Sequence, residues 1–183
     1  MSAVADKEEL LKVYDENHHF TGMYEKRSVV HNNCLYHNEV ALWIIDKENK
    51  RVLMEKRSPF KKLNPNKFAL CAGHVVGDES IEEALSKEVE EELGLDVGEL
   101  SVMPLTIIKR NEQNNFCFSH HFYTLSGGID INSLKLQEEE VSEVCWLDYD
   151  EVKKLTKENS HKIIFIWNEN YQKLFNLLDL IIY

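Results

Sequence analysis

The sequence predicts one globular domain of the α/β or α+β class. Its 183 residues suit a single domain. Hydrophobic residues make up 43% of the chain, which is enough to bury a core and excludes global disorder. Alternating β-rich runs dominate the middle of the chain and helical patterns dominate its end, an order typical of mixed folds.

The N-terminal part of the chain is expected to be mostly strand. Two β-rich runs around the polar turn ENHH predict a hairpin from residues 10–15 and 20–23, followed by a short polar helix through 24–30. The alternating runs NEVALWIID at 38–46 and RVLMEKR at 51–57 predict two strands joined by a polar turn.

A basic loop and three further strands are expected next. Pro59 and Pro65 bound the loop, and the run FALCAGHVV predicts a strand that breaks at Gly73. Two more β-rich runs, at 101–110 and 116–125, flank the polar turn NEQNN.

The C-terminal part is expected to end in helices. A short strand at 141–147 leads into a helix at 148–156, and a last helix covers roughly 162–181. The whole chain, 1–183, is then a single domain with three parts. These are an N-terminal hairpin with a short helix, a core and a C-terminal helix, at residues 1–36, 37–155 and 156–183.

Composition excludes several classes of protein. The net charge of −11 argues against nucleic acid as a broad partner, because such binding needs a basic face. No run of about 18 apolar residues predicts a membrane span, and the polar N-terminus lacks an apolar secretory core. The four cysteines form no C-x-x-C pair, which favours reduced thiols and a cytoplasmic location over a cysteine-built zinc site.

The acidic charge is concentrated in two segments. Residues 78–99 hold ten acids and one base, and residues 138–151 hold seven acids and no base. Residues 47–67, by contrast, hold eight bases and two acids. Most charge runs are solvated faces, but a basic stretch beside an acidic one also suits a metal-chelated anion such as a diphosphate.

The helix at 80–94 has clear ends. Ser80 with Glu83 three residues later forms a capping box, and Gly94 supplies the C-terminal stop. Winding the sequence at about 100° per residue puts Glu88, Glu91 and Glu92 in or beside the apolar arc, with Lys87 on the solvated side.

Three explanations of these glutamates remain open. In the first, the glutamates are solubilising surface residues; in the second, they pair with bases from 47–67; in the third, they hold a hard divalent cation through their carboxylate oxygens. Mg²⁺ and Mn²⁺ select such ligands. The cation is favoured because Glu88 and Glu92 form a like-charge i,i+4 pair, and turning carboxylates inward costs several kcal/mol each without compensation.

The same residues carry a family resemblance. The pattern G-x5-E-x7-K-E-V-x-E-E-x-G-L, which begins at Gly73, resembles the Nudix box, G-x5-E-x7-R-E-U-x-E-E-x-G-U with U apolar. Lys87 replaces the arginine, and every other fixed position matches. The resemblance extends from about His37 to Leu155 and implies an α/β/α sandwich built on a mixed sheet.

This resemblance also implies a function and a site. The expected activity is Mg²⁺- or Mn²⁺-dependent hydrolysis of a diphosphate linkage in a small nucleoside-diphosphate-type compound. Glu88, Glu91 and Glu92 correspond to the metal-binding and catalytic carboxylates, which the carbonyl of Gly73 often joins. Glu79 normally pairs with the box arginine, so Lys87 is expected to weaken this support because it lacks the bidentate fork. Which glutamate serves as general base stays open.

Three segments, RSVVHNNCLYHNEVALWII at 27–45, RSPFKKLNP at 57–65 and GHVVGDES at 73–80, resemble the Nudix branch related to isopentenyl-diphosphate isomerase. In that enzyme two upstream histidines, the histidine of Gly-His and late glutamates bind metals. The residues in comparable places are His31, His37, His74, Glu138 and Glu140. The catalytic cysteine is replaced by Ala72, and Cys71 is expected on the opposite face of the strand. Isomerase activity is therefore the alternative rather than the main prediction.

Further residues are candidates for substrate binding. They are the bases and polar groups expected near the diphosphate, namely Arg57, Lys61, Lys62, His74 and Glu140. The apolar runs SHHFYTL and FNLLDLIIY are expected to form core or a subunit contact, so a homodimer is possible. A second class of function is a binding or regulatory module that retains the fold without catalysis.

Overall fold

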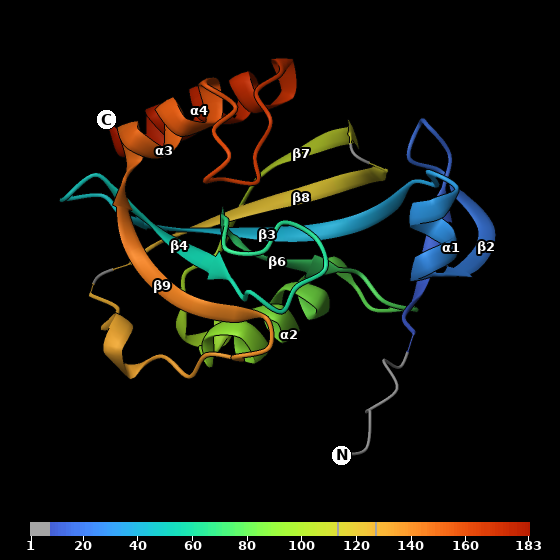
Figure 1. Ribbon diagram of the computed structural model, residues 1–183, viewed down its shortest axis with the longest axis horizontal. Helices are drawn as coiled ribbons and strands as arrows, with labels where there is room; N and C mark the ends of the chain where they lie inside the picture. The colour runs from blue at the N-terminus through green and yellow to red at the C-terminus, as the bar shows by residue number, and fades with distance from the viewer. Residues whose placement is uncertain (1–7, 113, 127) are drawn as a thin grey trace.

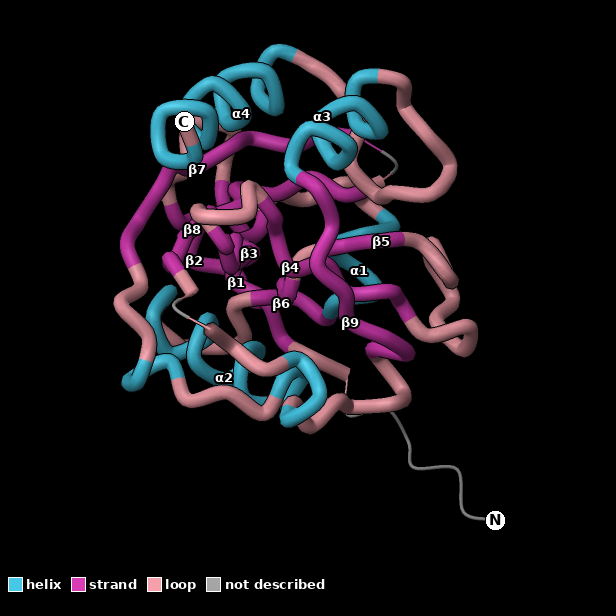
Figure 2. Tube along the Cα trace, turned by 90° about the vertical axis from the view of Figure 1, so that its left-hand side faces the viewer, coloured by secondary structure: helices cyan, strands magenta, loops and turns pink. Residues whose placement is uncertain are grey.

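A mixed seven-stranded sheet lies between two helical layers in the computed structural model, which describes residues 8–112, 114–126 and 128–183 (Figure 1). One face of the sheet is covered by α2 (Ile81–Leu93). The other is covered by α3 (Tyr149–Lys157) and α4 (Glu169–Ile182), and Figure 2 shows the three layers from the side. The expected α/β sandwich is confirmed. Residues 1–7, 113 and 127 fall within the predicted domain parts but lie outside the described residues.

The sheet is mixed because one central pair of strands is parallel. The strand order is β5-β4-β3-β8-β7, with β6 also paired to β3 and β9 to β4. Only the β3–β8 pair is parallel among the described strands. The bounds are His37–Asp46 for β3, Arg51–Arg57 for β4, Phe68–Ala69 for β5, Cys71–His74 for β6, Met103–Glu112 for β7, Asn115–Leu125 for β8 and Val141–Asp148 for β9.

The apolar run of β3 supplies two cores at once. Leu42 and Ile44 pack towards α2, whereas Trp43 and Ile45 pack towards α3 and α4. This follows from the alternation of side chains along a strand. A strand buried on both faces reads as a continuous hydrophobic run, as this one does.

The N-terminal hairpin packs against one end of the sheet (Figure 1). It consists of β1 (Leu10–Tyr14) and β2 (Phe20–Lys26), and α1 (Arg27–Asn32) follows. The amide of Gly77 donates to the carbonyl of Leu10 at 2.8 Å, which ties the loop after β6 to the hairpin. The helix expected at 24–30 is shifted, because β2 continues through its pairing with β1 to Lys26.

Two other predicted boundaries are wrong. The strand expected to break at Gly73 breaks at Leu70 instead, because β5 pairs with β4 while β6 pairs with β3. The last helix begins at Glu169 rather than near residue 162, and Asn168 caps it. Residues 163–167 are apolar but form an irregular segment, and Ile163 and Phe165 fill the core from this loop.

The helix predicted at 80–94 is confirmed with its caps. Ser80 and Glu83 form the reciprocal capping box, and Gly94 closes the helix in the left-handed region at φ +66°. Among the described helices none is long and apolar enough to cross a membrane.

Candidate active site

Two glutamates of α2 face the sheet. The side chain of Glu88 is 14% exposed and Glu92 is 8% exposed, which matches their positions beside the apolar arc. Glu91 lies at the edge of that arc and is exposed, so it faces solvent rather than the sheet. The structure thus separates the three predicted carboxylates into an inner pair and an outer one.

The inner pair lies directly against β6. A Cβ atom at Gly73 would come within 2.0 Å of the Glu88 Cδ and 2.3 Å of both its carboxylate oxygens. The amide of Ala72 donates to Glu92 Oε2 at 3.2 Å. Both carboxylates therefore lie against the backbone of β6, the strand that carries Gly73.

The pKa values of both carboxyl groups are raised above the usual value for glutamate. Burial raises the pKa of Glu88 to about 8, and the neighbouring Glu92 charge adds to the effect. Burial also raises the pKa of Glu92 to about 7, against hydrogen bonds from Cys71 and from the Ala72 amide. Two acids held together against a strand have a strong need for positive charge, so their oxygens fit a divalent cation.

Lys87 supports this site from one side. Its Nζ lies 3.7 Å from Glu79 Oε1 and 4.0 Å from Glu88 Oε1, so its long side chain reaches back towards the carboxylates. This contact with two carboxylates corrects the expectation that Lys87 lies on the solvated side of the helix. Glu79 Oε2 also accepts from the Val76 amide at 3.0 Å, which fixes the loop before α2.

The basic loop contributes one cation near Glu92. Lys61 forms an ion pair with Glu140, and the charges of both residues act on the pKa of Glu92. Arg57 is directed inwards to its own loop, since its Nε and Nη2 donate to the Leu63 carbonyl at 3.3 and 3.2 Å. Lys62 is exposed. Of the candidate substrate-binding residues in this region, Lys61 and Glu140 are therefore brought to the site, whereas Arg57 and Lys62 are not.

His74 belongs to a separate cluster of imidazoles. One ring nitrogen each of His31, His37 and His74 lie within 4.8 Å of one another, and the His31 and His74 Nε2 atoms are 3.2 Å apart. His74 follows Gly73 in β6, so its side chain lies on the opposite face of the strand from Glu88. Burial lowers the pKa of His74 and lowers that of His31 to about 4.

The carboxylates beside these imidazoles are not the late glutamates. Glu9 Oε2 lies 3.4 Å from His74 Nδ1, and Glu39 Oε1 lies 3.9 Å from His74 Nε2. Glu138 is exposed, and Glu140 pairs with Lys61. The correspondence of Glu138 and Glu140 to the isomerase's metal ligands is therefore wrong. Both lie in the segment before β9, whereas the imidazoles gather where α1, β3 and β6 meet.

The cysteine expected to face away from the isomerase position does so. Cys71 is 4% exposed and packs in the core beneath α2, while Ala72 is exposed on the other face. No thiol thus occupies the place that an isomerase cysteine would need.

Glu55 is not singled out by the sequence, yet it lies beside the inner pair. It is 4% exposed on β4, and one of its oxygens groups with Cys71 Sγ and a Glu92 oxygen within 4.8 Å. The alternation of side chains along β4 could have predicted that Glu55 faces α2. Leu53 faces α2, so the residue two positions later faces it too.

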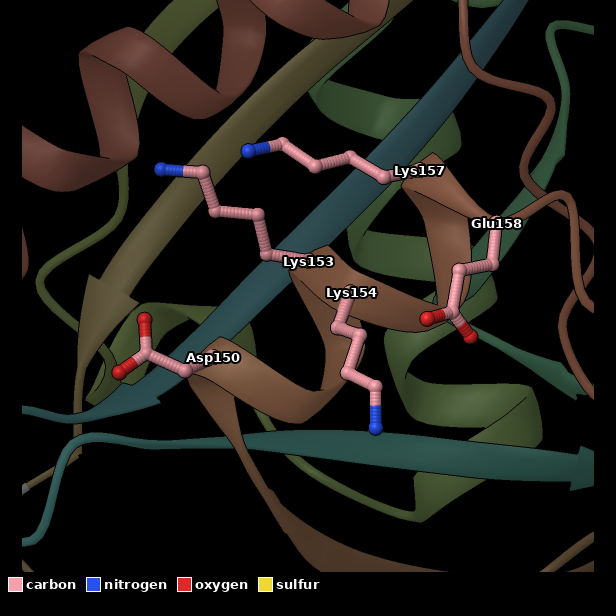
Figure 3. A pocket seen from close by; sticks show the side chains of 5 residues that line it. All are labelled: Asp150, Lys153, Lys154, Lys157 and Glu158. Carbon is pink, nitrogen blue, oxygen red and sulfur yellow. The ribbon is translucent and has the colours of Figure 1, made fainter.

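A hollow on the outer surface of α3 is unrelated to this site. Figure 3 shows its lining, which comes from α3 and the residue after it, and its volume is about 420 Å³. Lys153 is paired with Asp179 of α4, and Lys154 lies 3.6 Å from Glu151. The hollow lies on the opposite face of the sheet from α2 and its glutamates.

A mixed sheet between helices, with buried glutamates of one helix against a glycine of the strand that precedes it, defines a Nudix-type protein. The NUDIX domain family matches residues 35–167. An uncharacterised Nudix hydrolase of Clostridium acetobutylicum is 32% identical over 155 residues, which cover 80% of this chain and 73% of the relative. The chain therefore belongs to the Nudix family, and it is a Nudix hydrolase, an enzyme that acts on pyrophosphate bonds.

Solved structures agree with the fold. The crystal structure of DR0079 from Deinococcus radiodurans has a TM-score of 0.71 and 18% identity, and the match covers 92% of this chain and 99% of that one. A bifunctional NMN adenylyltransferase/ADP ribose pyrophosphatase of Francisella tularensis was solved with AMP and a manganese ion. It has a TM-score of 0.57 and 18% identity over 78% of this chain and 41% of that one.

Proposed function

We propose that the chain is a divalent-metal-dependent hydrolase that cleaves the diphosphate linkage of a small nucleoside-diphosphate-type compound. The observation that carries this proposal is the placement of Glu88 and Glu92 along the strand of Gly73, with the pKa of each raised by burial. The Francisella enzyme was solved as a complex with AMP and manganese, which supports both the ligand class and the type of metal.

Glu88 and Glu92 are the proposed ligands of Mg²⁺ or Mn²⁺, together with the carbonyl of Gly73. Such an ion would neutralise phosphate oxygens and lower the pKa of a bound water. Glu91 is exposed beside the pair, where it can accept a proton from the attacking water or add an oxygen ligand. Lys87 and Glu79 hold the start of α2 in place from the side.

The diphosphate is proposed to lie between this carboxylate pair and the basic loop. Lys61 pairs with Glu140 and its charge acts on Glu92, so a phosphate oxygen can take over part of its contact with Glu140. Arg57 shapes the loop by its bonds to Leu63. Lys62 is left to contact the outer end of the ligand from its exposed position.

The test is hydrolysis of a panel of nucleoside diphosphates, sugar nucleotides and dinucleotides, with the monophosphate products separated by chromatography, because a diphosphate substituted at both ends gives two monophosphates and no free phosphate. The assay is run with Mg²⁺, with Mn²⁺ and then with chelator. We expect hydrolysis of at least one compound that chelator abolishes and added metal restores. Activity that survives chelation would contradict the metal mechanism. Metal and nucleotide binding without turnover would instead favour a binding or regulatory module.

The cluster of His31, His37 and His74 favours one alternative, an enzyme of the isopentenyl-diphosphate isomerase type. Three imidazoles so close together suit a transition metal. Ala72 argues against this alternative, because allylic proton transfer needs an accurately placed donor. Incubation with isopentenyl diphosphate separates the possibilities, since isomerisation and phosphate release give different products.

A further inference from the structure

Three buried donor atoms meet beneath α2, next to the proposed magnesium site. They come from Glu55 on β4, Cys71 on β6 and Glu92 on α2, and all lie within 4.8 Å of one another. We propose that they form an inner metal site that binds a thiophilic divalent cation such as Zn²⁺. The site shares Glu92 with the proposed hydrolytic centre, but its existence does not depend on hydrolysis.

Glu55 gives the first argument for a bound ion. It is 4% exposed, and its Oε1 has no hydrogen-bond partner among the described residues. A buried carboxyl oxygen without a partner is costly, and few such atoms occur in native proteins. The two bases that follow it are engaged elsewhere, since Lys56 pairs with Glu143 and Arg57 donates to the Leu63 carbonyl. A cation between Glu55 and Glu92 would satisfy both carboxyl groups at once.

An ion bound here would displace protons from its donors. Metal ligands must be deprotonated, so Zn²⁺ would replace the protons of Cys71 and of the two carboxyl groups, and all three groups would then act as ligands.

The donor set determines which ion fits. Mg²⁺ prefers oxygen ligands, keeps several waters and dehydrates reluctantly, whereas Zn²⁺ binds thiolate and carboxylate together in a tetrahedral site. A buried site with one sulfur and two carboxyl groups therefore excludes Mg²⁺ and favours Zn²⁺. Three protein donors leave one of the four tetrahedral positions for a further ligand.

Cobalt provides a probe that reports on the sulfur ligand. We expect titration of the full chain with Co²⁺ to produce a thiolate-to-cobalt charge-transfer band in the near ultraviolet. Cys71→Ser should abolish the band. Cys117→Ser is the matched control, because Cys117 is equally buried and its Sγ also lies beside an acid, Glu39, at 3.1 Å. A band that persists in Cys71→Ser, or that disappears in Cys117→Ser, overturns the assignment.

Glu55→Gln tests the carboxyl ligand by stoichiometry and stability. Dialysed wild-type protein should retain one more equivalent of Zn²⁺ than the variant, whatever the histidine cluster binds. In chelator the variant should melt at or above the wild-type temperature, since it removes a buried acid. Zn²⁺ should then raise the melting temperature of the wild type more than that of the variant.

Glu143→Gln serves as the control for this series, because Glu143 is a half-exposed carboxylate on β9 that pairs with Lys56. Equal Zn²⁺ retention by wild type and Glu55→Gln would refute the inner site. Mg²⁺-dependent hydrolysis by the same preparations is scored separately. If the wild type shows no hydrolysis, the proposed function is refuted but the inner site is not. If the wild type hydrolyses its substrate but fails the Zn²⁺ and Co²⁺ tests, the inner site is refuted and the proposed function is not.

Discussion

The carboxylate of Glu88 occupies the space where a side chain at Gly73 would begin. Its Cδ lies 2.0 Å from the position of an ideal Cβ on that glycine. The contact joins α2 to β6 at one point and brings the carboxylate against the strand backbone. The glycine is therefore required by the close approach of Glu88 rather than by any turn of the strand.

Gly73→Ala should displace Glu88 and damage the proposed metal site. A Cβ at this position meets both carboxylate oxygens, so the side chain must leave. We expect turnover to fall about a hundredfold because the Glu88 carboxylate must move away, whereas the free energy of unfolding should change by less than about 1 kcal/mol, since only the far end of a flexible side chain has to shift. The assays are Mg²⁺-dependent hydrolysis and a urea titration.

Gly98→Ala is the matched control for this change. A Cβ at Gly98 would lie 3.1 Å from Asp96 Oδ1, and its nearest neighbours all belong to Asp96 rather than to α2. Normal turnover in Gly73→Ala would show that the Glu88 carboxylate does not need its place beside β6.

Glu92→Gln should reduce turnover by at least about a hundredfold while the domain stays folded. The substitution keeps the shape of the side chain and its contact with the Ala72 amide, but removes a charge that a cation needs. Glu90→Gln on the exposed face of α2 is the control. Turnover and circular dichroism are measured together, and near-normal turnover of a folded Glu92→Gln protein would reject its role as ligand.

Local patterns predict the parts of the site that lie on one element. The capping box, Gly94 and the apolar period determine α2 and the inward direction of Glu88 and Glu92, because these depend on residues within a few turns. The Nudix box adds the contact with Gly73, which no period could reveal. Glu91 faces solvent, because a helix packed on a sheet buries only the middle of its arc.

Local sequence patterns do not predict contacts between segments that are distant in the sequence. Glu9 reaches His74 only because the hairpin packs on the loop after β6. Glu55 lies in the basic stretch of the sequence, although the alternation of β4 turns it towards α2. The apolar residues 163–167 before α4 suggest helix, but they form an irregular segment because they fill a core that several strands and helices define together.

Lys61→Gln should weaken substrate binding more than it slows the chemical step. Lys61 is the loop cation whose charge acts on Glu92, so its loss removes attraction for a diphosphate in both ground and transition states. We expect KM to rise roughly tenfold with a smaller change in kcat. Lys47→Gln, in the exposed turn between β3 and β4, is the control. An unchanged KM would remove Lys61 from the binding site.

Lys87→Arg should strengthen the support of the site. Lys87 lies 3.7 Å from Glu79 and 4.0 Å from Glu88, which are ion-pair rather than hydrogen-bond distances. Arginine offers a planar fork to a carboxylate. We expect a gain of about 0.2–1 kcal/mol in the free energy of unfolding and equal or higher turnover, whereas Lys87→Met should lower both. A loss of activity in Lys87→Arg would show that the site is built around lysine.

His121 should make the protein sensitive to acid. It is 3% exposed and accepts from the Trp43 indole at 3.1 Å, and burial lowers its pKa to about 3 from an ordinary 6.5. A depressed pKa means that the unfolded chain binds this proton first. The stabilisation is therefore complete above pH 6.5 and is lost as the pH falls towards 3.

The contribution of His121 can be isolated by His121→Gln, because glutamine keeps an acceptor for Trp43 but does not titrate. Between about pH 6 and 4 the unfolding free energy of the wild type should fall more steeply than that of the variant, by about 1.4 kcal/mol per pH unit. Urea titrations at several pH values measure this difference, with the exposed His161→Gln as control. Parallel slopes for the wild type and His121→Gln would mean that this imidazole takes up its proton without opposing the fold.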